Sequence, residues 1–75
     1  MAIEQLAIFH VQELVDRRRE IVLRAYSLSD TVSLVASALD VPADHVWDRK
    51  RFGIMEVNYG DEFLAAGPRG VIAVF

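Results

Sequence analysis

Apolar residues recur at helical spacing through the first third of the chain. They are Ile3, Leu6, Ala7, Val11, Leu14, Ile21, Val22 and Ala25. Apolar positions three or four residues apart are typical of an amphipathic helix, so we expect a helix over about residues 3–25. The run Arg17-Arg18-Arg19 interrupts this apolar pattern. A helix ending near Arg19, followed by a short strand over Ile21–Tyr26, is therefore the alternative.

Two further helices are expected before residue 53. Ser27 followed by Asp30 fits a capping box, in which a serine hydroxyl accepts from a backbone amide at the start of a helix. It predicts a helix over residues 28–39, whose inner face carries Val32, Val35, Ala36 and Leu39. Pro42 is well placed near the first turn of another helix, which we expect over residues 43–52.

From Ile54 onward the pattern favours strands. Gly60-Asp61 fits a two-residue hairpin turn after a strand over Ile54–Tyr59. The expected cross-strand pairs are Tyr59 with Glu62, Val57 with Leu64, and Met55 with Ala66. After a second turn, Val71–Phe75 forms a third strand. The expected fold class is α+β, with three helices followed by a small antiparallel meander. It forms a single domain of residues 1–75, divided into residues 1–27, 28–52 and 53–75.

Length and composition narrow the function classes. A chain of 75 residues has room for one small domain of marginal stability, which makes a homodimer a reasonable expectation. The absence of cysteine excludes disulfides and a thiol nucleophile, and it favours a cytoplasmic location. No targeting signal and no apolar run of membrane-spanning length is visible, so no membrane partner is expected.

One pattern has a specific spacing. Ala36, Asp40 and Val46 stand where a helix-turn-helix needs a small residue, a left-handed turn and a branched apolar plug. Residues 32–51 therefore resemble the helix-turn-helix motif of DNA-binding regulators, of the small phage or mobile-element type. The turn position usually holds glycine, for which Asp40 is a tolerated substitute. The resemblance implies a winged-helix-like arrangement in which the following hairpin is the wing.

The resemblance also implies a DNA-reading surface. Its outward helix face would present Asp44, Trp47, Asp48 and Arg51 to the major groove. Arg49 and Lys50 would contact phosphates. Arg17 and Arg18, in the run Arg17–Arg19, would add a second basic patch if the first helix lies beside the groove; the alternative for this run is a solvated helix face. Charge gives this surface limited support, because residues 43–52 carry +1 and the segments on either side carry −2 each, within a total of −3.

Trp47 fits three roles: a core residue, a protein-interface anchor or a DNA contact. Two histidines without cysteine predict no metal site, and no nucleophile–base pair is visible, so we expect no enzyme, no cofactor and no small-molecule substrate. The leading hypothesis is a dimeric transcriptional regulator that binds double-stranded DNA. The alternative is a phage-type protein-interaction module, an inhibitor or adaptor of a host protein, with Asp44, Trp47 and Asp48 as its contact surface. Self-assembly through the first helix and the apolar strand Val71–Phe75 is a third hypothesis.

Overall fold

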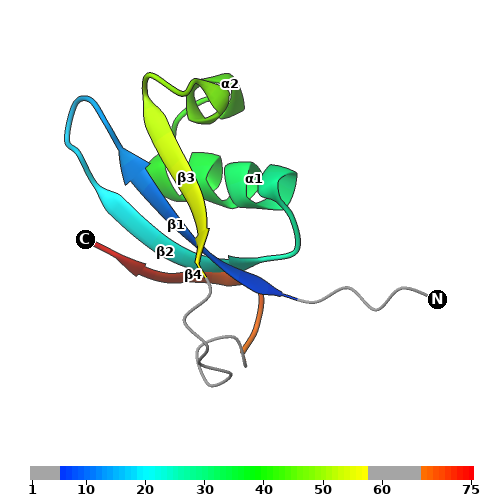
Figure 1. Ribbon diagram of the computed structural model, residues 1–75. Helices are drawn as coiled ribbons and strands as arrows, with labels where there is room; N and C mark the ends of the chain where they lie inside the picture. The colour runs from blue at the N-terminus through cyan, green and yellow to red at the C-terminus, as the bar shows by residue number, and fades with distance from the viewer. Residues whose placement is uncertain (1–5, 58–66) are drawn as a thin grey trace.

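A computed structural model describes residues 6–57 and 67–75. Its elements in chain order are β1 (Ala7–Glu13), β2 (Glu20–Ala25), α1 (Leu28–Leu39), α2 (Ala43–Trp47), β3 (Phe52–Val57) and β4 (Gly70–Val74). The strands form one antiparallel sheet in the order β3-β1-β2-β4, and α1 packs across one face of it (Figure 1). The strands β3 and β4 are therefore the two edges of the sheet.

The core lies between this sheet and α1. Alternate residues of β2 are buried, so one face of that strand points to the helix and the other does not. The register places Phe9 opposite Leu23 and Val11 opposite Ile21 on the same face. The main hydrophobic cluster comprises Phe9, Val11, Ile21, Leu23, Ala25, Val32, Val35, Leu39, Val46 and Phe52.

The expected first helix is wrong, because residues 7–25 form a β-hairpin. The alternative, a shorter helix followed by a strand over Ile21–Tyr26, is correct for the strand, since β2 covers most of these residues. The segment is rich in β-branched and aromatic residues, among them Phe9, Val11 and Ile21, and these pack well in strands. The strand β1 also lies between β2 and β3. Pairing on both of its sides satisfies its backbone and overrides the helical spacing.

The turn of this hairpin uses no glycine. Asp16 and Arg18 adopt left-handed backbone with φ of 61° and 53°. The buried carboxylate of Glu13 accepts from the Arg19 backbone amide at 3.1 Å and from the Arg19 Nε at 3.1 Å. These hydrogen bonds from Arg19 offset the cost of burying the charged Glu13 carboxylate.

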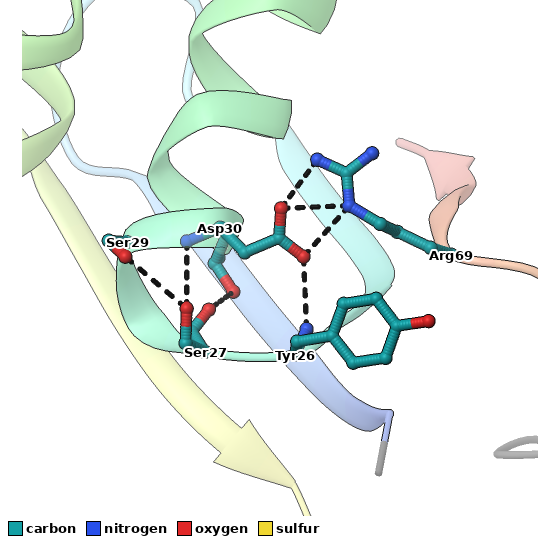
Figure 2. Close-up of polar contacts among 6 residues, drawn as sticks. Tyr26, Ser27, Ser29, Asp30 and Arg69 are labelled. Atoms are coloured by element: carbon teal, nitrogen blue, oxygen red, sulfur yellow. Dashed lines mark hydrogen bonds and ion pairs between the residues drawn. The ribbon is translucent and has the colours of Figure 1, made fainter. Parts of the chain in front are cut away.

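The start of α1 confirms the serine cap, whereas the Asp30 carboxylate reaches back one residue further than a capping box requires. The Ser27 hydroxyl accepts from the Asp30 amide at 3.1 Å, and the Asp30 carboxylate accepts from the Tyr26 amide at 3.0 Å. The same carboxylate accepts a hydrogen bond from the Arg69 Nε at 2.8 Å (Figure 2). Arg69 lies just before β4, so this ion pair ties the segment leading into the edge strand to the first turn of the helix.

The corner between the helices keeps the local features of the predicted motif. Asp40 is left-handed, with φ 56° and ψ 50°, and Val46 is buried with 1% of its surface exposed. However, α2 ends at Trp47 after 5 residues, whereas a helix over residues 43–52 was expected. The Asp48 side chain accepts from the Lys50 amide at 2.9 Å, and the Asp48 carbonyl accepts from the Arg51 amide at 2.9 Å. These turn contacts replace the helical pattern from Asp48 onward.

The predicted fold class is therefore wrong in its architecture. The structure is α+β, but it has 4 antiparallel strands and two helices, of which only α1 is long, in place of three helices followed by a hairpin. The final strand is close to its expected position, since β4 covers Gly70–Val74. Met55 pairs with His10 of β1. Its expected partner and the turn at Gly60-Asp61 lie outside the described residues.

Candidate interaction site

The eight residues predicted for DNA contact lie at one end of the sheet, in the β1–β2 turn, in α2 and in the turn after α2. Arg17 and Arg18 are exposed in the β1–β2 turn, whereas the other six belong to α2 and the turn after it. The Leu14 amide donates to the Arg51 carbonyl at 2.7 Å and joins the two turns. The structure therefore brings the predicted cations together, but it sets them on turns and not along one helix face.

The charges at this end are only partly paired. Arg51 forms an ion pair with Asp48 at 3.6 Å, and Arg19 pairs with Glu13. Within residues 6–57 and 67–75, Arg17, Arg18, Arg49 and Lys50 make no ion pair. Asp44 is exposed on α2 close to these cations in sequence. The end of the molecule is thus a mixed surface with a small positive excess.

Trp47 is not part of the core, because 50% of its surface is exposed. It lines a groove of about 410 Å³ between α2, the first turn of α1 and β3. Leu28 at 46% exposure and the partly buried Ile54 line the same groove. The remaining lining residues are Val46, Arg49, Phe52 and Gly53. A large aromatic side chain beside an apolar hollow is the arrangement that anchors protein interfaces.

The groove borders an open edge of the sheet. In the described part of the chain, β3 pairs with β1 on one side and with no strand on the other. Antiparallel residue pairs alternate between those that exchange hydrogen bonds and those that do not. The Leu14 amide donates to the Arg51 carbonyl, and bonded pairs recur at every second position of the register. The backbone groups of Gly53, Met55 and Val57 in β3 therefore form their hydrogen bonds with β1. The N–H and C=O groups of Ile54 and Glu56 therefore point outward.

Two carboxyl groups have shifted pKa values, and both belong to structural contacts. The hydrogen bond from the Arg19 side chain holds the pKa of Glu13 below its ordinary value. The hydrogen bond from the Arg69 side chain, with the Tyr26 amide, lowers the pKa of Asp30 in the same way. Neither group lines the groove, so these shifts describe ion pairs that support the fold and not an acid or base at the site.

Sequence reasoning selected Trp47 and Arg49 but missed the apolar half of the groove. The sequence pattern places Leu28 only at a helix start, Phe52 in the third expected helix and Ile54 in a strand of the expected meander. The alternation of Phe52, Ile54 and Glu56 on one face of a strand was the available signal. It became informative only once β3 was paired with β1, because that pairing fixes which face meets α2.

Among the described residues, no group of histidine, cysteine, aspartate or glutamate side chains has the arrangement of a metal site. No helix in the same part of the chain is long and apolar enough to cross a membrane. Comparison with known proteins finds no matching family model, no matching curated protein and no matching solved structure.

Proposed function

We propose that the chain is a protein-interaction module that binds a partner through the groove formed around Trp47. The observation that carries this proposal is the half-exposed Trp47 beside a mostly apolar groove and a strand edge that no other strand pairs with in the described part of the chain. Exposing a tryptophan to water forgoes the stabilisation that its burial would contribute. A partner that covers Trp47 recovers this stabilisation on binding.

A capture experiment with matched variants tests the proposal. The chain, its Trp47→Ala variant and its Tyr26→Ala variant are used to retain partners from a lysate, after circular dichroism has shown that both variants fold. Tyr26 is a suitable control because it is an aromatic residue with 46% exposure outside the groove. Trp47→Ala should lose a partner that Tyr26→Ala retains. Identical partner lists for Trp47→Ala and the parent chain would rule out the groove as the binding site.

Binding of double-stranded DNA is a second candidate function. It is favoured by the clustering of Arg17, Arg18, Arg49 and Lys50 at one end of the sheet. With α2 only 5 residues long, contact would come from turns to phosphates and not from a helix in the major groove. Such binding should weaken steeply with salt, because each neutralised phosphate releases a counterion. Fluorescence anisotropy with a random duplex, repeated with Lys50→Ala, measures this slope, and absence of binding at low salt would eliminate this candidate.

A second copy of the chain is also a proposed partner, through the edge strand β4. Residues 70–75 carry no charged side chain, and Val74 and Phe75 are 49% and 73% exposed. An apolar strand edge without charged side chains favours pairing with another strand. Two copies of β4 running antiparallel about a two-fold axis would join the sheets without placing like charges opposite each other.

A further inference from the structure

We propose that the edge of β3 accepts an extended segment of the partner protein as an added antiparallel strand. An apolar side chain of that segment enters the Trp47 groove, and an acidic side chain lies beside Arg49. This inference rests on the proposed function and names the chemistry of the ligand. Such strand addition takes its affinity from main-chain hydrogen bonds and its specificity from pockets for alternate side chains.

The backbone of β3 provides the first half of the argument. Ile54 and Glu56 direct their N–H and C=O groups away from β1, as the bonded Leu14–Arg51 pair and the register require. The two residues are separated by one position, so an incoming strand finds two outward donor–acceptor pairs at the spacing of an antiparallel ladder. In the described part of the chain, no other strand uses them.

The groove provides the second half. Side chains that face each other across an antiparallel pair lie on the same face of the sheet. A ligand residue bonded to Ile54 therefore projects its side chain to the face on which Ile54 borders the groove with Trp47 and Leu28. The volume of about 410 Å³ lies within the range of small-ligand pockets. The same residue of the ligand thus forms the backbone bonds and fills the groove.

Charge sets the composition and direction of the ligand. Arg49 lines the groove and Lys50 follows it, both near the start of β3, whereas Glu56 lies toward the end of that strand. All strand pairs in the sheet are antiparallel, and antiparallel pairing is slightly more stable per residue. An antiparallel ligand therefore carries, in order, a basic, an apolar and an acidic side chain at alternate positions.

A synthetic peptide tests this geometry on the full chain. The probe is a capped heptapeptide with leucine at its centre, lysine two residues before, aspartate two residues after, and threonine elsewhere. Trp47 is the single tryptophan of the chain, so its fluorescence reports occupancy of the groove. We expect a shift in Trp47 emission together with at least ~10-fold slower amide hydrogen exchange at Ile54 and Glu56. The Met55 amide, already bonded to β1, should change little.

Two altered peptides separate the parts of the inference. A peptide with lysine and aspartate exchanged should bind about two- to fivefold more weakly, since exposed charge pairs contribute little each. N-methylation of the central leucine removes the N–H that donates to the Ile54 carbonyl, and it should weaken binding at least ~5-fold. Equal affinity of the exchanged peptide would overturn the charge assignment. Equal affinity of the methylated peptide would overturn the strand pairing.

Two variants of the protein at Glu56 test the same strand pairing. Glu56→Pro removes an outward N–H that β1 does not use, and proline is tolerated on such an edge. Glu56→Ala removes the same side chain and keeps the N–H. Weaker peptide binding by Glu56→Pro than by Glu56→Ala supports strand addition, and equal binding contradicts it. A change in Trp47 fluorescence without slower hydrogen exchange at Ile54 and Glu56 would overturn strand addition and leave groove binding intact. If the peptides cause neither change, this inference alone is overturned, because partner capture tests the proposed function separately.

Discussion

Left-handed backbone at residues other than glycine marks the two corners that shape this fold. In the described chain these residues are Asp16, Arg18 and Asp40, with φ of 61°, 53° and 56°. A left-handed L-residue crowds its Cβ against the following carbonyl, at a cost of roughly 1–2 kcal/mol, and aspartate tolerates this better than arginine. Arg18 is therefore the most strained of the three.

Replacing Arg18 with glycine should stabilise the protein. Arg18→Gly removes the Cβ contact but adds freedom to the unfolded chain, so we expect a net gain of about 0.5–1 kcal/mol in the free energy of unfolding. Urea unfolding measures this change. Arg17→Gly is the control and should destabilise, because Arg17 has no positive φ to relieve. A loss of stability in both variants would show that the strain at Arg18 is absent.

The Glu13 carboxylate should make stability depend on acid pH. The pKa of Glu13 is lower in the folded chain than its ordinary value of 4.5, because the Arg19 side chain donates to it. The stabilisation is fully present above pH 4.5 and is lost as the pH falls through the lower folded pKa. Thermal unfolding from pH 6 down to pH 3 should show a smaller decline for Glu13→Gln than for the parent chain. Parallel declines would show that the Glu13–Arg19 pair contributes no pH dependence.

At the scale of elements, α1 is the part of the fold whose local signals and final structure agree. The sequence predicted residues 28–39 as a helix, and α1 spans Leu28–Leu39 with Val32, Val35 and Leu39 buried. Capping, apolar spacing and the turn at Asp40 all act within a few residues, so they do not depend on the pairing of the sheet. By contrast, the hairpin of β1 and β2 depends on contacts that reach across a turn and on β3.

Loss of the α1 cap should destabilise the protein by about 1 kcal/mol. Ser27→Ala removes the hydroxyl that accepts from the Asp30 amide and leaves that amide without its partner. Ser27→Thr should retain most of the stability, since threonine also caps. Ser29→Ala is the matched control, because among the described residues the Ser29 hydroxyl hydrogen-bonds the Ser27 hydroxyl, at 3.3 Å, and no backbone amide. Denaturant midpoints of the four proteins decide between them, and equal midpoints for Ser27→Ala and Ser29→Ala would contradict the capping role.

At the scale of the whole molecule, the two edges of the sheet differ in chemistry. The edge at β3 combines an apolar groove with Arg49 at one end and Glu56 at the other. The edge at β4 is apolar and has no charged side chain over residues 70–75. Its ladder to β2 continues through Phe75, whose N–H and C=O bond the backbone of Glu20 at 2.7 and 3.1 Å. This contrast is why we assign a partner segment to β3 and a second copy to β4.

Association through β4 should be abolished by one charge. The Glu20–Phe75 pair is bonded, so the alternation of the ladder directs the N–H and C=O of Val74 to the open edge. Val74→Lys would bring two lysines close together across a two-fold β4 pair. Sedimentation velocity should show a dimer for the parent chain and for Ser37→Lys, an exposed site on α1, and a monomer for Val74→Lys. A monomeric parent chain would refute this interface.

The sequence by itself determined the features that act over short distances: the α1 boundaries, the Ser27 cap, the left-handed Asp40, the buried Val46 and the final strand. It also singled out Trp47 and the clustered cations. Only the tertiary structure decided that residues 7–25 are a hairpin, because β1 forms its hydrogen bonds with β2 and with the distant β3. The groove depends on the same pairing. Its lining residues come from α1, α2, β3 and the turn before β3. Patterns over a few residues do not predict which of these segments pack together.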